Sequence, residues 1–278
     1  MLITWIQALL LGLVSCFAGD NLSPVGTTAG NYSLSRPLVA SLIVGLILGD
    51  VRGVIMMAVP VQLIFIAMIT PGGTMLADLR SVSYIGLPLA WALCKQWGIV
   101  PGSAVSQELA GPFAAVIGII FVFQYKWTSR LNEIWQKKGW DEINQGNLNV
   151  LTGTQTWMPF ISHLIASFLP VFLTTFFGSM LIKLLPMVDI SNPFMKAVLS
   201  IGMVLPAIGI AIVLNAAVSK PFELLLFGAG FVLGAYFRLP ILSCILIGSV
   251  FAIIDYWFHE PKKAAEGSAA ADDDEEDI

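Results

Sequence analysis

The sequence predicts an all-α, polytopic membrane protein that combines several full transmembrane helices with short, broken or re-entrant helical hairpins. Of its 278 residues, 57% are hydrophobic and only 12% are charged, whereas a soluble domain carries about 25% charged residues. The mean hydropathy is +0.84. About half of the apolar runs are shorter than the roughly 20 residues that a spanning helix needs. We therefore expect a multi-pass protein embedded in a lipid bilayer.

The apolar runs fall into two classes of length. Long runs lie at about 3–19, 160–185, 194–217 and 239–258. Shorter runs, interrupted by Gly, Pro or charge, lie at about 37–49, 53–70, 82–98, 110–125 and 222–237. No Lys or Arg precedes Arg36, so the first run lacks the basic start of a signal peptide and is predicted to be a membrane helix or half-helix. Short, interrupted segments favour a transporter with a binding site near the midplane, because irregular backbone at that depth must line a cavity or be buried in protein.

Basic side chains indicate which loops face the cytoplasm. The longest polar connection, 126–158, is one of these loops, and its large apolar residues recur at helical spacing, so we expect an amphipathic cytoplasmic element there. A docking surface for a soluble partner is a second interpretation of the same segment. Further basic ends occur at Lys220 and at Lys262–Lys263, an arrangement that fits four crossings between 160 and 258 and a cytoplasmic C-terminus. The basic residues of the connection are Lys126, Arg130, Lys137 and Lys138.

We expect one integral membrane domain over 1–258, which includes the segment 126–158, followed by an acidic tail over 259–278. The last fifteen residues, AAEGSAAADDDEEDI, contain seven of the 18 acidic side chains and no basic one. The remaining 11 acidic side chains are outnumbered by 14 basic ones. The tail is therefore predicted to be disordered, and the membrane domain to be mildly basic although the net charge is −4.

Two charges interrupt the apolar stretch LIVGLILGDVRGVIMM at 42–57. A charged residue at the centre of a bilayer costs about 2.5–3.5 kcal/mol on insertion scales. Glycines flank both charges, and glycine allows the backbone to turn. We therefore predict a helical hairpin over 37–70, with the charges either in a loop at the membrane surface or in an ion pair at the break. The candidates for its bend, and for gating, are Gly49, Asp50, Arg52 and Gly53.

Polar side chains concentrate in VPVQLIFIAMITPGGTMLADLRSVSYIG, at 59–86. Buried polar groups need partners, so a polar wall among apolar helices predicts a wet cavity, and amides, carboxylates and hydroxyls are groups that bind sugars. Pro71-Gly72-Gly73 is expected in a turn that is exposed or lines the cavity. An interhelical hydrogen bond of Gln62 and an interface ion pair of Asp78 with Arg80 are the structural alternatives. The substrate-binding candidates are Gln62, Thr70, Thr74, Asp78 and Arg80.

The sequence shows no pattern typical of catalysis, of a cofactor or of a metal site. It contains no Walker loop, no G-x-S-x-G and no C-x-x-C or Cys/His cluster. Cys16, Cys94 and Cys244 lie in apolar segments and are interpreted as packing residues. His163, inside an apolar run, and His259, near the end of one, are interpreted as structural hydrogen-bonding residues. We therefore expect no catalytic residues, no metal, no cofactor and no nucleic-acid partner.

Several short motifs follow one another in a fixed order in the N-terminal third. Ala18-Gly19, Arg36-Pro37, the sequence VGLILGD at 44–50 and Arg52-Gly53 occur in turn. In this order they resemble the enzyme IIC subunits of the mannose/fructose/sorbose family of the bacterial phosphotransferase system (PTS). The resemblance covers about residues 1–100, and chain length and hydropathy agree with it beyond that point.

The resemblance implies a membrane translocation subunit of a phosphoenolpyruvate-dependent sugar phosphotransferase system in a bacterial inner membrane. It implies a multimer in which a second membrane subunit, IID, completes the sugar pathway. Cytoplasmic IIA and IIB subunits would carry the phosphoryl groups, so this chain would not itself be an enzyme. A rocking or elevator-like shift of a core against a scaffold is the implied motion, and short hairpins suit it.

Two positions depart from the pattern of many mannose-type members. Those proteins carry a glutamate where this chain has Gln62, and a proline–aspartate where it has Ala77-Asp78. An amide can donate as well as accept hydrogen bonds, so an amino sugar, a sugar acid or a glycated amine is as compatible a substrate as mannose. The alternative function is an ion-coupled secondary transporter of a small polar solute. It would need a buried carboxylate, and the later long runs contain none before Asp255.

Overall fold

The structure is a computed structural model that describes residues 2–19, 25–68, 75–187, 189–218, 221–254 and 256–257. It divides into two compact units, Met1–Val213 and Leu214–Ile278. The first unit contains α1 (Trp5–Ser15), α2 (Gly26–Ala29), η1 (Gly30–Leu34), α3 (Pro37–Leu48), α4 (Val51–Ile64), α5 (Leu79–Ser81), η3 (Val82–Gly86), α6 (Leu87–Gln96), α7 (Ala104–Asn144), α8 (Val150–Thr152), η4 (Gly153–Trp157), α9 (Met158–Leu184) and most of α10 (Pro193–Ala217). The second contains α11 (Pro221–Ala235) and a helix over Ile241–Ile254.

The prediction of an all-α, polytopic membrane protein is confirmed. Among the described residues, three helices are long and apolar enough to cross a membrane, namely Ala104–Asn144, Val150–Leu184 and Pro193–Ala217. The pair Gly26–Leu34 and Pro37–Leu48 would form a fourth span, bent by 78°. Other apolar helices, among them α1 and α4, have only 10–17 residues. Full spans and short, broken elements therefore occur together, as the lengths of the apolar runs indicate.

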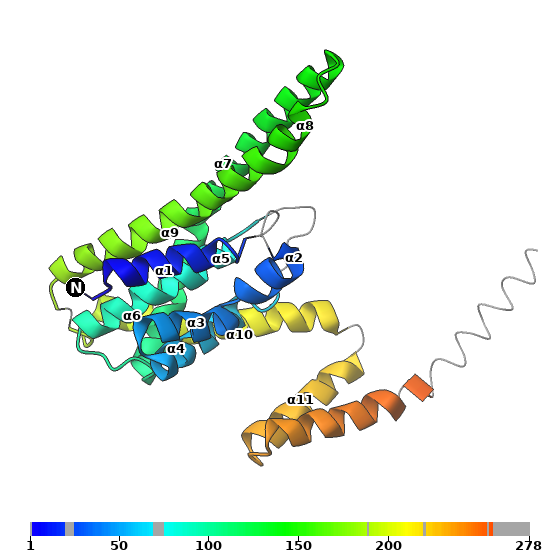
Figure 1. The fold of residues 1–278 in the computed structure, drawn as a ribbon. Coiled ribbons are helices and arrows are strands. Elements are labelled where there is room, and N and C mark those ends of the chain that lie inside the picture. Colours follow the sequence, from blue (N-terminus) through cyan, green and yellow to red (C-terminus); the bar gives the residue numbers. More distant parts are fainter. Residues whose placement is uncertain are drawn as a thin grey trace, which may run out of the picture. The chain divides into compact units, whose positions relative to one another are not determined.

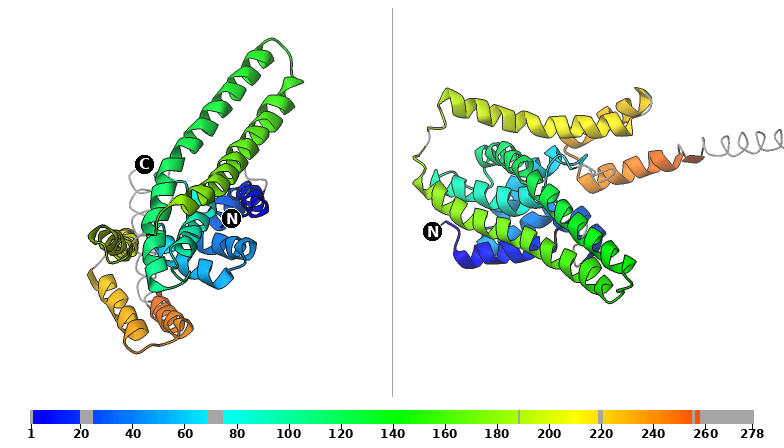
Figure 2. Two further views of the ribbon diagram at one scale, coloured as in Figure 1. Left: turned by 90° about the vertical axis from the view of Figure 1, so that its left-hand side faces the viewer. Right: turned by 90° about the horizontal axis from the view of Figure 1, so that it is seen from above.

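The helices α7 and α9 pack against each other as a long pair that projects beyond the other helices of the first unit (Figures 1 and 2). The sequence predicted a short apolar element over 110–125 followed by a separate connection, but α7 runs unbroken over 41 residues. At 1.5 Å per residue it is about 60 Å long, twice the roughly 30 Å of a hydrocarbon core. Hydropathy shows where apolarity ends, and the helix continues because the charged residues beyond that point are good helix formers.

The helix α6 is the centre of the first unit. Its residues from Leu87 to Cys94 are all buried, and a helix that is enclosed on every side is typical of a protein core. It contacts α3, α4, α7 and α9. Charge begins only at Lys95, in the last turn. These four helices therefore pack around an apolar element that begins directly after the polar segment 75–86.

The helices α3 and α4 form a hairpin whose turn contains the predicted charges. Gly49 ends α3 in the left-handed region, with φ of 76°. Asp50 caps α4, because its carboxylate accepts a hydrogen bond from the Gly53 backbone N–H at 3.0 Å. The second carboxylate oxygen accepts from Trp91 Nε1 at 2.9 Å. Asp50 is thus a helix cap bound to α6 and makes no ion pair with Arg52 within the described residues.

The open end of the same hairpin is closed by two further side chains. Arg36, just before α3, donates from its guanidinium to the carbonyls of Phe65 (3.2 Å) and Met68 (2.9 Å) after α4. Gln62 on α4 accepts from the Leu38 backbone N–H at 3.3 Å. Helix termini leave backbone groups without partners, and these contacts supply partners for them. The hairpin is therefore joined at both ends by hydrogen bonds.

We predict that Gly49→Ala lowers the stability of the protein by about 1–2 kcal/mol, the cost of placing a side chain in the left-handed region. The measurement is the thermal midpoint of the purified protein in detergent. Gly153→Ala is the matched control, because Gly153 has an ordinary helical φ of −67° and an added Cβ there would meet no atom within 4 Å. An equal loss for the two variants would show that the turn does not require glycine.

Candidate functional site

A small polar cavity of about 70 Å³ lies inside the first unit. Its walls come from the chain after α1, from η1, from the segment before α5, and from the long helices α7 and α9. The lining residues are Ala18, Gly19, Asn31, Ser35, Met75, Asp78, Arg80, Tyr125, Thr128, Ser129, Asn132 and His163. Roughly 10–15 Å³ is enough for one water molecule, so this space is large enough for a few waters among mostly polar side chains.

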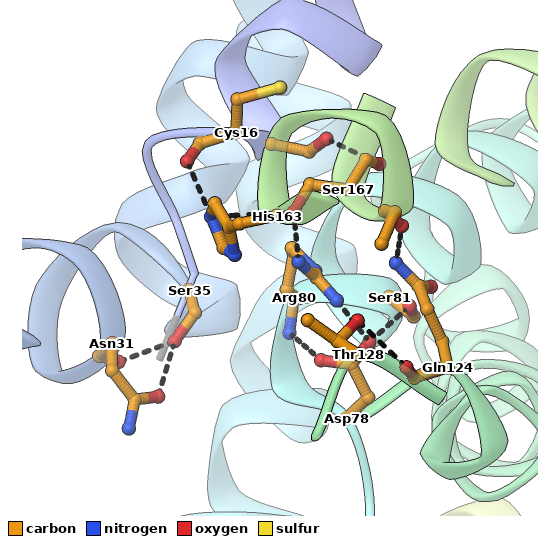
Figure 3. Close-up of polar contacts among 12 residues, drawn as sticks. Cys16, Asn31, Ser35, Asp78, Arg80, Ser81, Gln124, Thr128, His163 and Ser167 are labelled. Atoms are coloured by element: carbon orange, nitrogen blue, oxygen red, sulfur yellow. Dashed lines mark hydrogen bonds and ion pairs between the residues drawn. The ribbon is translucent and has the colours of Figure 1, made fainter. Parts of the chain in front are cut away.

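An ion pair between Asp78 and Arg80 lies at the centre of this site (Figure 3). The side chains are almost completely buried, at 4% and 10% exposure, and Asp78 Oδ2 lies 3.3 Å from a terminal guanidinium nitrogen of Arg80. Asp78 Oδ1 accepts from the Arg80 backbone N–H at 3.1 Å, and Oδ2 accepts from Ser81 Oγ at 2.5 Å. The other terminal nitrogen of Arg80 donates to Ser167 Oγ on α9. A buried charge needs such partners to remain ionised.

Backbone contacts hold the segment that carries this pair. The Asp78 N–H donates to the Gly118 carbonyl of α7 at 2.9 Å. Beyond the pair, η3 donates from Ser83 Oγ to the Ser35 carbonyl (2.7 Å) and from the Tyr84 hydroxyl to the Leu34 carbonyl (3.0 Å). Both η1 and η3 are π-helical, a conformation that is frequent at functional sites. The cavity is thus built where chain segments that are not regular α-helix meet the long helices α7 and α9.

His163 brings a ring nitrogen to the same cavity from α9. Its Nε2 lies 3.2 Å from the Cys16 carbonyl and 3.4 Å from Ser167 Oγ, so Ser167 contacts both Arg80 and His163 (Figure 3). Gly19 faces the ring so closely that a Cβ on it would collide with the imidazole. The chain after α1 therefore passes directly over His163.

The structure brings together only some of the substrate-binding candidates. Asp78 and Arg80 line the cavity. Gln62 is on α4, bonded to the backbone of α3, and is not among the lining residues. Thr70 and Thr74 lie outside the described residues. The four candidates of the hairpin bend, Gly49, Asp50, Arg52 and Gly53, all lie at the turn between α3 and α4.

Several lining residues were not among the candidates predicted from the sequence. Tyr125, Thr128, Ser129 and Asn132 lie on one face of α7, at the i, i+3, i+4 and i+7 positions. This spacing could have identified them, but the segment was interpreted as a cytoplasmic connection. His163 was interpreted as a structural residue, because nothing in the sequence places it beside Arg80.

Broken helices around a polar cavity in a polytopic helical protein define a membrane transport component. The profile of the family described as the PTS system sorbose-specific IIC component matches residues 5–254, and the chain therefore belongs to this family. It is a multi-pass membrane component of a sugar phosphotransferase system. The resemblance noted from the N-terminal motifs is confirmed, and it extends over most of the chain.

Individual relatives are distant but are matched over most of their length. The chain is 26% identical to the PTS system sorbose-specific EIIC component of Lacticaseibacillus casei, over 91% of this chain and 86% of the relative. It is 23% identical to the PTS system mannose-specific EIIC component of Escherichia coli K12, over 91% of this chain and 89% of that relative. A solved structure described only as a membrane protein has a TM-score of 0.68 at 21% identity, covering 94% of this chain and 99% of that one. This structural likeness supports the fold.

We predict that Asp78→Ala lowers the free energy of unfolding by about 3–5 kcal/mol, because it leaves the buried Arg80 guanidinium without its counter-charge. Unfolding of the purified protein in detergent measures the change. Asp189→Ala is the matched control, because the Asp189 carboxylate is fully exposed and bonds only the neighbouring Ser191 in the described structure. This variant should leave the stability nearly unchanged. Similar losses for both variants would contradict a stabilising role of the buried pair.

Proposed function

We propose that this chain is the sugar-translocating subunit of a phosphoenolpyruvate-dependent phosphotransferase system and that sugar passes through the cavity at Asp78 and Arg80. One observation supports the location above all others. The ion pair found among the described residues is buried and lines a polar cavity. Ionisable residues inside a membrane protein are rare, and they characteristically mark substrate or ion pathways.

The lining has hydrogen-bonding capacity that a sugar can use. The Asp78 carboxylate accepts three hydrogen bonds out of about four that its lone pairs permit. Arg80 Nε and Asn132 Oδ1 are buried without a partner among the described residues. A hydroxyl group can both donate and accept, so it matches a lining that offers donors and acceptors. These free positions favour a polyhydroxylated substrate.

The cavity must widen to admit a sugar. Ligand sites usually have volumes of roughly 300–1,000 Å³, whereas this cavity has about 70 Å³. In our proposal the α3–α4 hairpin moves as one body, because hydrogen bonds join it at both ends. Gly49, Asp50, Arg52 and Gly53 would form the bend that moves. Gln62, Thr70 and Thr74 would reach the sugar in the widened state.

The same proposal assigns the phosphoryl chemistry to other proteins. Cytoplasmic IIA and IIB subunits would carry the phosphoryl group, and a IID subunit would complete the pathway in the bacterial inner membrane. Large apolar side chains on α7 and α9 are exposed, among them Ile120 (59%), Phe123 (71%) and Ile165 (53%). Such faces are suited to lipid or to another membrane subunit. The basic residues of α7 would lie on the cytoplasmic side, together with the C-terminus.

We predict that cells carrying this chain with its cognate IIA, IIB and IID subunits accumulate a phosphorylated sugar when phosphoenolpyruvate is available. Uptake of a labelled sugar panel and analysis of the intracellular product measure this. Asp78→Asn should lower the uptake rate at least about tenfold, because it removes the charge that holds Arg80 in place. Gln62→Ala tests whether α4 contributes to binding, and Asp189→Asn should leave uptake unchanged at equal protein levels in the membrane.

Two outcomes would contradict parts of this proposal. Accumulation of an unmodified solute that depends on a proton or sodium gradient would overturn the proposal and favour the ion-coupled carrier. If the Asp78→Asn variant accumulates phosphorylated sugar at the wild-type rate, the transport function stands and the sugar pathway lies elsewhere in the chain.

A further inference from the structure

His163 is a buried imidazole whose role is not explained by packing alone. It is 5% exposed and lies on α9, where it lines the polar cavity beside Arg80. Thr175, another buried polar residue of α9, bonds only the carbonyls of its own helix. His163 instead bonds to the chain segment after α1, through the Cys16 carbonyl.

This contact determines which ring nitrogen carries the proton. A carbonyl oxygen can only accept a hydrogen bond, so Nε2 must be the donor. A second positive charge buried beside the Arg80 guanidinium would be costly, so the ring is neutral and Nδ1 is an acceptor. No described residue donates a hydrogen bond to Nδ1, and this nitrogen points away from Cys16 toward the space between Ser35 and Arg80 (Figure 3).

Gly19 keeps the ring in this position. A Cβ at residue 19 would overlap Cε1 and Nε2 of His163 but would remain 3.4 Å from Nδ1. The absent side chain therefore makes room for the edge of the ring that contacts Cys16. A larger residue there would displace the imidazole without changing its chemistry.

We propose that Nδ1 of His163 accepts a hydrogen bond from one hydroxyl group of the transported sugar and that Gly19 is the residue that positions the ring. The inference rests on the proposed function and adds a specificity-determining residue to it. A neutral acceptor requires a hydrogen-bond donor on the substrate. It therefore favours a sugar with a free hydroxyl at this position over one that presents a carboxylate there.

Two substitutions separate the two hydrogen bonds of the ring. In His163→Gln the amide N–H extends as far as Nε2 and can still donate to Cys16, but the acceptor at the Nδ1 position is lost. In His163→Asn the amide lies at the position of Nδ1 and retains an acceptor there, but it is too short to reach Cys16. Thr175→Val is the matched control on α9, because the Thr175 hydroxyl bonds only its own helix.

The experiment measures half-saturation of phosphoenolpyruvate-dependent uptake for the transported sugar and for its monodeoxy analogues, which each lack one hydroxyl. In the wild type, one analogue should have a half-saturation constant about threefold to tenfold higher than the parent sugar, as expected for the loss of one hydrogen bond. His163→Gln should abolish this difference for that analogue alone. His163→Asn and Thr175→Val should retain it, and Gly19→Ala should reduce it.

Each alternative result has a separate consequence. If His163→Gln transports the sugar and shows the same difference for every analogue as the wild type, His163 is structural and the inference is wrong, while the proposed function stands. If His163→Asn loses the difference although it is present in the membrane at normal levels, an acceptor at Nδ1 is not sufficient and the inference is also wrong. If the wild type takes up no sugar that depends on phosphoenolpyruvate, the proposed function and this inference fail together.

Discussion

A charged pair inside an apolar protein needs partners on every side, and the arrangement of the first unit depends on how Asp78 and Arg80 obtain theirs. The Asp78 backbone is bonded to α7 through Gly118, and the Arg80 guanidinium is bonded to α9 through Ser167. The pair thereby links the short α5 segment to both long helices. Replacing such a pair with apolar residues is often neutral or stabilising, so stability alone does not explain its presence. A role in defining one position for the polar segment, and with it the cavity, accounts for the pair better.

The ends of the short helices also carry polar groups that need hydrogen-bond partners. A helix that stops inside the membrane region exposes backbone groups that lipid cannot satisfy. In the α3–α4 hairpin these groups are bonded to side chains of the hairpin itself, through Asp50 and Gln62, and to the guanidinium of Arg36. Trp91 adds one bond from the enclosed α6 helix. Because few of these bonds leave the hairpin, the proposed movement of the hairpin would break few hydrogen bonds.

The cavity is lined both by the buried pair and by backbone that is not regular α-helix. Its residues come from segments as far apart in the sequence as Gly19 and His163, and η1 and α5 contribute Asn31 and Arg80. Asp78, Arg80 and His163 are held by hydrogen bonds to neighbouring residues, whereas Arg80 Nε and Asn132 Oδ1 have no partner among the described residues. The space is smaller than an ordinary ligand site. A sugar site of this kind would be specific because unpaired polar groups inside it are costly, and transport through it would require a conformational change.

The sequence by itself determined the membrane class, the positions of the short elements and the charged bend of the hairpin, because these depend on hydropathy, glycine and proline over a few neighbouring residues. It also identified Asp78 and Arg80, since two charges in an apolar stretch are visible locally. Tertiary structure decided what they contact. Arg80 bonds to Ser167 and Gly19 lies against His163, and both contacts join residues more than thirty positions apart. The α7 face at Tyr125 and Asn132 lines the same cavity. Local patterns carry no information on which distant helices meet. The continuity of α7 was missed for a related reason, because helix length is set by backbone hydrogen bonding and hydropathy reports only the part that lipid can cover.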